Sequence, residues 1–352
     1  MLMEENKSLA PFTTIEIGGP ARWFAEATSE ADVAEAAAWV REREVPLFVL
    51  GGGSNLLVSD AGFDGLVLHI GLKGIHVREG AENSNEHVYE AAAGEDWDNF
   101  VSRIVEDNCA GVECLAGIPG TVGGTPVQNV GAYGQEVSSV IERVRAFDLD
   151  QQSFVEFTAT ECGFAYRRSR FNAADRNRYV VTRVDYQLIR GGPPALHYAD
   201  LQRAFPDGSK PALNDVATAV RGIRRSKGML LEEGQPDCRS AGSFFKNPVL
   251  TETQVERIAS STGKQPPRFP AGPKPEFAAL VKVPAAWLID QAGFAKGYAS
   301  GAAGVSTLHT LALVNRGGAT ACDILALADQ INSAVVSRFG IRLEMEPVLV
   351  GF

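Results

Sequence analysis

The chain has 352 residues, 45% of them hydrophobic, and a formal net charge of −10. This length predicts two or three packed units. The negative charge excludes nucleic acid and anionic membrane surfaces as general partners, because neither would be attracted to the protein.

Residues 1–10 are charged and lack an apolar run, so we expect no signal peptide. No stretch of the sequence is long and apolar enough to span a bilayer. The five cysteines are scattered, without a Cys-x-x-Cys pair or a Cys/His cluster, so we expect free thiols and no metal site. These features predict a cytoplasmic protein without membrane insertion.

Predicted strands and helices follow one another without a regular βαβ alternation. Strands are expected at 13–17, 21–27, 46–50, 65–70, 87–93, 140–149, 154–159, 179–188 and 341–350, and helices at 30–43, 97–108, 215–225 and 321–339. The helix at 30–43 has apolar residues at helical spacing and Ser29 as a candidate N-cap. The mixture predicts an α+β fold.

The predicted strand 46–50 is followed by three glycines and two polar residues, Gly51, Gly52, Gly53, Ser54 and Asn55. Because glycine has no Cβ, the backbone N–H groups of such a run can approach an anion closely. The alternative is a tight turn between strands. The run has neither the Gly-Lys-Ser/Thr of a P-loop nor the spacing of a dinucleotide fingerprint.

A second glycine-rich stretch, residues 115–134, contains six glycines, two prolines and no charged side chain. An ordinary loop of this length is solvated and charged. Uncharged, glycine-rich backbone suits close packing against a flat, neutral ring system. The alternative is an unusually apolar structural loop.

Strings of residues along nearly the whole chain resemble one family. They are Leu50-Gly51-Gly52-Gly53-Ser54-Asn55, the stretch from Ile118-Pro119-Gly120 to Tyr133-Gly134, Tyr166-Arg167-Arg168-Ser169, Gly242-Ser243-Phe244-Phe245-Lys246-Asn247-Pro248 and Trp287-Leu288-Ile289-Asp290. Together they resemble the UDP-N-acetylenolpyruvoylglucosamine reductase (MurB) family of peptidoglycan synthesis. The FAD-binding part of that family is of the vanillyl-alcohol-oxidase (PCMH) type.

The resemblance implies an oxidoreductase of cell-wall synthesis, also termed UDP-N-acetylmuramate dehydrogenase. NADPH would reduce FAD, and flavin N5 would pass hydride to UDP-N-acetylglucosamine enolpyruvate, giving UDP-N-acetylmuramate. Some oxidases on the same FAD domain bind flavin covalently through a histidine, but Ser54 stands in that neighbourhood here, so we expect non-covalent FAD. The implied flavin contacts are Gly51, Gly52, Gly53, Ser54, Asn55, Ile118, Pro119, Gly120, Gly123, Gly124, Asn129, Gly131, Ala132 and Tyr133.

The resemblance also implies a catalytic trio. Arg167 would stabilise charge on the enolate-like intermediate, and Ser243 would donate the proton. The third member is Glu346, with Glu344 as the alternative, because strand alternation puts both on one face. From the residues alone, a surface ion pair for Arg167 and a turn or N-cap for Ser243 would also fit.

Four further residues match substrate contacts of the family. Tyr198 would belong to a loop that folds over the substrate, Lys227 and Asn247 would bind the diphosphate with it, and Gln291 would contact the uridine. None of the five histidines is assigned a role.

We expect three α+β domains, at 1–71 with 341–352, at 72–225 and at 226–340. The first two would form the FAD cradle and the third would bind substrate, in a monomeric protein. Two alternatives remain open, another flavin oxidase on the same cradle and a non-catalytic flavin- or nucleotide-binding regulator.

Overall fold

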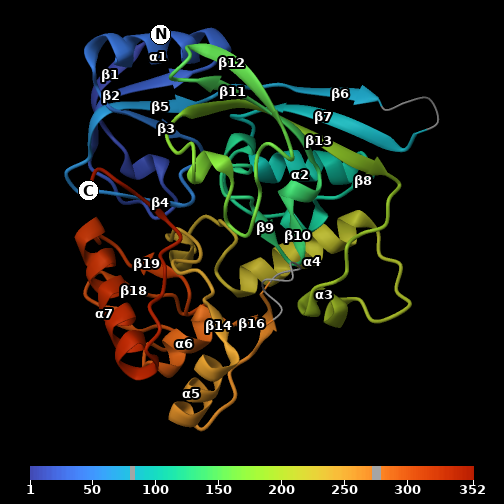
Figure 1. Ribbon diagram of the computed structural model, residues 1–352, viewed down its shortest axis with the longest axis vertical. Coiled ribbons are helices and arrows are strands. Elements are labelled where there is room, and N and C mark those ends of the chain that lie inside the picture. Colours follow the sequence, from blue (N-terminus) through green and yellow to red (C-terminus); the bar gives the residue numbers. More distant parts are fainter. Residues whose placement is uncertain (80–83, 272–278) are drawn as a thin grey trace. The chain divides into compact units, whose positions relative to one another are not determined.

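The computed structural model describes residues 1–79, 84–271 and 279–352 of the chain. It has two compact units, each built from several segments. Unit 1 comprises Met1–Lys7, Ala21–Gly53 and Phe63–Ser226, and unit 2 comprises Ser8–Pro20, Ser54–Gly62 and Lys227–Phe352. Both units mix helices and strands, which confirms the α+β class (Figure 1). The finer division into three domains stays a prediction.

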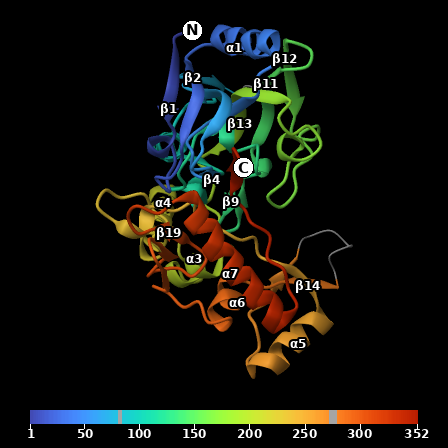
Figure 2. The same ribbon diagram turned by 90° about the vertical axis from the view of Figure 1, so that its left-hand side faces the viewer.

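The first sheet of unit 1 carries the predicted helix at 30–43. Its strand order is β1 (Met3–Ser8), β2 (Pro20–Ala27), β5 (Phe63–Ile70) and β3 (Leu47–Leu50), with β5 parallel to both of its neighbours. Helix α1 (Glu30–Arg43) joins β2 to β3 and lies over this sheet (Figures 1 and 2). It begins at Ser29, as predicted, because the Ser29 side chain and Asp32 form a capping box.

The second sheet of unit 1 is antiparallel. Its order is β12 (Ser153–Thr158), β11 (Ile141–Asp148), β13 (Tyr179–Arg190), β7 (Glu86–Ala92) and β6 (Ile75–Glu79), and β8 (Cys109–Ala110) also pairs with β13. Three helices complete the unit, α2 (Trp97–Glu106), α3 (Ala199–Ala204) and α4 (Leu213–Ser226).

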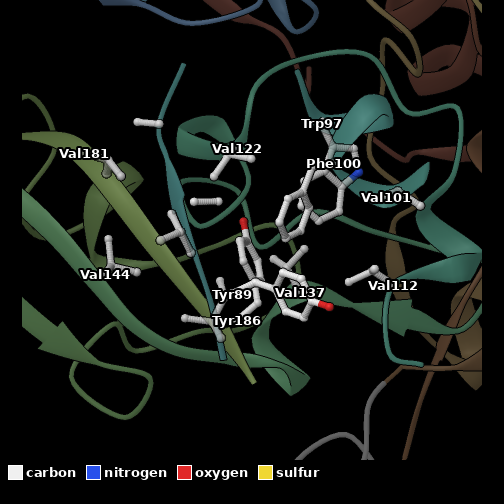
Figure 3. Close-up of a cluster of buried hydrophobic side chains, with 14 of the residues drawn as sticks. Tyr89, Trp97, Phe100, Val101, Val112, Val122, Val137, Val144, Val181 and Tyr186 are labelled. Atoms are coloured by element: carbon white, nitrogen blue, oxygen red, sulfur yellow. The ribbon is translucent and has the colours of Figure 1, made fainter. Parts of the chain in front are cut away.

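The core of unit 1 is centred on aromatic rings from α2 and the antiparallel sheet (Figure 3). The Phe100 ring lies 5.5 Å from Trp97 and 5.0 Å from Tyr186, centroid to centroid. The buried Tyr186 hydroxyl shares a hydrogen bond of 2.7 Å with Thr125 Oγ1, which belongs to the second glycine-rich stretch. The aromatic core therefore supports that stretch directly.

The described residues of unit 2 form short sheets and three α-helices. Its strands are β4 (Leu56–Val58) parallel to β20 (Val348–Val350), β14 (Val249–Thr251) and β15 (Phe269–Pro270) on either side of β16 (Leu280–Lys282), and β17 (Ala299–Ser300), β18 (Ala303–Val305) and β19 (Leu313–Asn315). The helices are α5 (Glu252–Thr262), α6 (Ala285–Gln291) and α7 (Ala321–Phe339). Helix α7 runs alongside α6 (Figure 2). No described helix is long and apolar enough to cross a membrane.

Two strand predictions were wrong, because alternating buried residues also occur outside strands. Residues 13–17 form a tight turn in which Ile17 N donates to Thr13 Oγ1 over 3.2 Å and Glu16 has a φ of +56°. The turn inserts Ile15 and Ile17 into the core of unit 2. At the end of the chain, only Val348–Val350 of the predicted strand 341–350 is a strand.

The segment before β20 forms only an isolated bridge, Phe245 with Met345, and is also held by a side chain of α7. Asn332 Oδ1 accepts from Leu343 N over 2.9 Å, and Asn332 Nδ2 donates to Leu343 O over 3.0 Å. Both polar backbone atoms of Leu343 are therefore occupied. Strand β1 was not predicted, because its sequence is charged rather than apolar.

Truncation of Phe100 tests the aromatic core of unit 1. We expect Phe100→Ala to lower the free energy of unfolding by about 3–5 kcal/mol, because it leaves a cavity among buried rings. Urea unfolding followed by tryptophan fluorescence would measure it. Val77→Ala, at a side chain 43% exposed, is the control and should change the value by less than about 0.5 kcal/mol. Equal losses in the two variants would contradict this picture of the core.

Candidate active site

In unit 1 the two glycine-rich stretches meet backbone to backbone. A Cβ built on Gly52 would lie 2.6 Å from Gly120 Cα, and one on Gly51 would lie 2.8 Å from Thr121 Oγ1. Gly120 is held at the start of α2, because its carbonyl accepts from Trp97 N over 3.0 Å. The first stretch follows β3, so the end of a strand and the start of a helix bring the two glycine runs into contact.

The backbone N–H group of Gly53 is a candidate donor to a bound ligand. The residue is buried and has a left-handed φ of +63°. Within the described part of the chain, its N–H group and that of Gly52 donate no hydrogen bond. Because a buried N–H group without an acceptor is costly, an anionic group bound here would supply the missing acceptor.

Asn129 connects the second glycine-rich stretch to the turn that carries Arg167. The side chain is buried, and its Nδ2 donates to Ala165 O over 3.1 Å and to Glu136 Oε2 over 3.2 Å. Its Oδ1 accepts from Ser138 N over 3.1 Å. Both ends of the amide are therefore used within unit 1.

Arg167 lies in a strained turn and reaches back to the same stretch. Its φ is +53°, which is unusual for a residue with a long side chain. Arg167 Nη2 donates to Gly131 O over 3.0 Å, and Asn172 Nδ2 donates to Arg167 O over 3.2 Å. The guanidinium is thereby held beside the predicted flavin contacts, as a positive charge on otherwise neutral backbone.

Two tyrosines of unit 1 meet at the end of this stretch. The ring of Tyr133, which is buried and has a φ of +50°, lies edge-on to the ring of Tyr198 with centroids 5.4 Å apart. Arg224, on α4, hydrogen-bonds Tyr133 and donates from Nε to Gly117 O over 2.8 Å. Burial lowers the pKa of Arg224, against the opposing effect of Tyr133. Arg224 was not predicted as a site residue, because no motif in the sequence marks it.

The remaining predicted flavin contacts of unit 1 lie along the same stretch, and most are half-buried. They are Ile118, Pro119, Gly123, Gly124, Gly131 and Ala132. A Cβ on Gly123 would lie 2.6 Å from Ala93 Cβ, so glycine is required there by the turn after β7 as well.

In unit 2, Ser243 and Glu346 lie on adjacent segments. Phe245 pairs with Met345 in an isolated antiparallel bridge, and Glu346 N donates to Phe244 O over 3.0 Å. Asn55, predicted as a flavin contact, donates from Nδ2 to Glu346 O over 3.2 Å. The pairing therefore places Glu346 next to the residue that follows Ser243.

Glu344 and Glu346 have different surroundings. The side chain of Glu344 is 73% exposed and pairs with Lys246, whereas Glu346 is half-buried. Ser243 is half-buried too, between Gly242, with a φ of +71°, and the fully buried Phe244. The structure thus separates two glutamates that strand periodicity could not.

Lys227 lies in a cationic cluster of unit 2. Burial is the largest cause that lowers the pKa of His309 to about 4, and the positive charges of Lys227 and Lys296 lower it further. His309 Nδ1 accepts from Leu311 N over 3.2 Å, and Leu311 O accepts from Phe244 N over 2.8 Å. His309 is therefore neutral at pH 7 and connected to the Ser243 segment. Neither Lys296 nor His309 was predicted, because no pattern in the sequence links them to Lys227.

Of the other two predicted substrate contacts, Asn247 binds the start of α6 and Gln291 lies at its end. Asn247 Oδ1 accepts from Ala285 N over 2.9 Å and so orients the start of the helix. Gln291 is its last residue and donates to Asp290 Oδ2 over 3.1 Å. Ser54, predicted as a flavin contact, lies in unit 2, where its backbone carbonyl accepts from Thr14 Oγ1 over 3.5 Å.

The match to known proteins covers the chain almost completely. Residues 235–350 match the C-terminal domain of UDP-N-acetylenolpyruvoylglucosamine reductase, and residues 21–153 match an FAD binding domain. The reductase of Streptomyces coelicolor is 46% identical over 97% of this chain and 89% of its own length. That of Thermobifida fusca is 44% identical over 98% of this chain and 97% of its own. The chain belongs to the UDP-N-acetylenolpyruvoylglucosamine reductase family.

A solved structure of the MurB family has the same fold. The crystal structure of the Thermus caldophilus enzyme covers 99% of this chain and 100% of its own, with a TM-score of 0.67 and 25% identity. The family resemblance stated from the sequence strings is thereby confirmed.

The residues of unit 1 fit FAD, the cofactor implied by the matched domain. Gly52 leaves no room for a Cβ against the backbone of Gly120, and Gly53 offers a buried donor to an anionic group. The uncharged stretch with Pro119 and Ala132 suits the ring system. Within the described ranges, no group of three or more His, Cys, Asp or Glu side chains is placed to hold a metal ion.

The contact between the two glycine-rich stretches predicts that a methyl group added at Gly52 lowers the affinity for FAD. We expect Gly52→Ala to weaken FAD binding at least tenfold, because its Cβ would collide with the backbone of Gly120. Flavin fluorescence titration of the apoprotein would measure the dissociation constant. Gly222→Ala, on α4 with no atom within 4 Å of the new Cβ, is the control and should leave FAD affinity unchanged. Unchanged affinity in Gly52→Ala would remove this part of the site.

Proposed function

We propose that the protein reduces UDP-N-acetylglucosamine enolpyruvate to UDP-N-acetylmuramate, with NADPH as electron donor and non-covalent FAD as carrier. Membership of the MurB family supports the reaction. The observation that carries the assignment of residues is the hydrogen bond from Glu346 N to Phe244 O, which sets Glu346 beside the Ser243 segment.

FAD, when bound, would transfer two electrons from NADPH to the enol ether. The protein must stabilise negative charge that develops on the substrate carboxylate and deliver one proton to the neighbouring carbon. We assign charge stabilisation to Arg167, whose guanidinium is held at Gly131 O. Its fixed position is important because a preorganised cation needs no reorientation during the reaction.

We assign proton donation to Ser243. A serine hydroxyl is a weak acid, so it would transfer a proton only to a strongly basic, carbanion-like carbon. The buried side chains of Phe244 and Phe245 follow it on the chain and fix that segment in the core of unit 2. Water would then reprotonate the serine after product release.

Glu346 would act beside Ser243 as a hydrogen-bond donor. A carboxylate would repel the developing negative charge, so this role needs the acid form of the side chain. The half-buried position of Glu346 favours it over the exposed, ion-paired Glu344.

The cationic cluster of unit 2 would bind the substrate diphosphate. Lys227 and Lys296 both lie close enough to His309 to lower its pKa, and lysine ammonium groups bind phosphate oxygens through charge-assisted hydrogen bonds. We add Lys296 to the predicted set of Tyr198, Lys227, Asn247 and Gln291.

A cytoplasmic location is supported by four buried free thiols among the five cysteines. The monomeric state stays a prediction.

Removal of the Ser243 hydroxyl should separate the two half-reactions. In anaerobic stopped-flow experiments, we expect Ser243→Ala to accept electrons from NADPH at a rate within about twofold of the wild type. Reoxidation by the enolpyruvyl sugar should slow by about 10²–10⁴-fold, because the proton donor is gone. If the reduced wild-type flavin is reoxidised only by oxygen, the proposed substrate is wrong. If Ser243→Ala is reoxidised normally by the sugar, another group donates the proton.

Substitution of the two glutamates should distinguish their roles. We expect Glu346→Ala to slow reoxidation by the sugar by about 10²-fold or more, and Glu346→Gln to retain part of the activity, because its amide can still donate a hydrogen bond. Glu344→Gln, at an exposed side chain, is the matched control and should change kcat by less than about twofold. The reverse order of effects would transfer the role to Glu344.

A further inference from the structure

Glu113 is a fully buried carboxylate in unit 1 that the proposed reaction does not use. It lies in the short 3₁₀ helix η2 (Glu113–Leu115) and is 0% exposed. Its Oε1 accepts from Gln135 Nε2 and from Ala195 N, each over 2.8 Å, and its Oε2 accepts from Gly111 N over 2.8 Å. Burial of a carboxylate is costly unless such donors satisfy it, and these three donors come from three separate positions of unit 1 that Glu113 thereby connects.

The next residue, Cys114, contacts the same two partners. Cys114 N donates to Gln135 Oε1 over 2.8 Å, and Cys114 Sγ donates to Ala195 O over 3.2 Å. Burial raises the pKa of the Cys114 thiol, so it remains protonated and available as a donor. Glu113 and Cys114 therefore hold both polar backbone atoms of Ala195.

The two anchored segments each carry one of the paired tyrosines. Gln135 is two residues after Tyr133, and Ala195 is three residues before Tyr198. The tyrosine rings pack edge to face at 5.4 Å, and a Cβ on Gly134 would lie 3.8 Å from Tyr198 N. The segment 195–198 thus lies directly against the end of the glycine-rich stretch.

We infer that Glu113 is a positioning residue that fixes the segment 195–198 to the glycine-rich stretch, so that Tyr198 is held against Tyr133. The inference rests on the proposed function in one respect, the contact of Tyr198 with the UDP sugar. Its structural part, the anchoring of Ala195, can be tested without catalysis.

Glu113→Gln tests the anchor. The single amide oxygen can accept either from Ala195 N and Gln135 Nε2 or from Gly111 N, so at least one buried N–H group faces an NH₂ group. We expect the KM for the enolpyruvyl sugar to rise about tenfold, the effect of a buried donor left without an acceptor. The rate of flavin reduction by NADPH should change by less than about twofold. Glu106→Gln, at an exposed position on α2, is the matched control and should change neither.

The double variant Glu113→Gln with Gln135→Glu isolates the contact with Ala195. It restores an amide–carboxylate pair between positions 113 and 135, and the carboxylate introduced at position 135 can still accept from Cys114 N. Ala195 N, however, would still face an NH₂ group. We therefore expect the thermal midpoint to recover toward the wild type while the KM stays raised. A KM that returns to the wild-type value would overturn the inference.

Hydrogen exchange of the backbone amides provides the readout without substrate. We expect the amides of 195–198 to exchange at least tenfold faster in Glu113→Gln and in the double variant, with NADPH and sugar absent. Cys114→Ala, which removes only the thiol donor, should accelerate them less. If the wild type fails to turn over the sugar but the exchange results hold, the proposed function fails and the anchor stands. Unchanged exchange in both Glu113 variants would overturn the anchor itself.

Discussion

The close approach of two glycine-rich backbones is the constraint on which the predicted cofactor site of unit 1 depends. Gly52 and Gly120 leave no space for a Cβ between them. Their contact needs the end of β3 and the start of α2 to be fixed independently, and the two sheets with their aromatic core do this. The rigid parts of the unit therefore lie in sheets and helix, while the predicted binding atoms lie on backbone that side chains cannot cover.

Polar side chains, rather than regular secondary structure, shape the rest of the second glycine-rich stretch. Asn129 connects it to the turn of Arg167, and Arg224 connects its two ends by contacts with Gly117 O and Tyr133. Glu113 adds a third connection, to the segment of Tyr198. A stretch without charges is thus positioned by buried polar groups around it, each satisfied by backbone donors or acceptors.

Unit 2 is discontinuous in sequence, and its proposed chemistry depends on that. Strand β20 pairs with β4, which belongs to the inserted segment Ser54–Gly62, and Asn55 holds the carbonyl of Glu346. The same part of the chain pairs with the Ser243 segment through Phe245 and Met345. Residues about 100 and 290 positions apart in sequence are therefore adjacent, which local periodicity cannot report.

The sequence by itself determined the elements with strong local signals and the family. Helices α1 and α7, the four antiparallel strands β7, β11, β12 and β13, and the α+β class were predicted from apolar spacing and caps, because those interactions act within a few residues. The glycine runs and the string around Ser243 were enough to identify the family. The strand predictions at 13–17 and 341–347 were wrong. The alternating buried residues belong to a turn in the first segment and to a stretch hydrogen-bonded to Asn332 in the second.

Only the tertiary structure decided the surroundings of the predicted residues. It made Glu344 exposed and Glu346 half-buried, brought Lys296 and His309 to Lys227, and set Glu113 against Ala195. These differences depend on contacts between segments far apart in the chain. Their free energy comes from burial and from hydrogen bonds that form only when the segments meet, so no local pattern of residues could have revealed them.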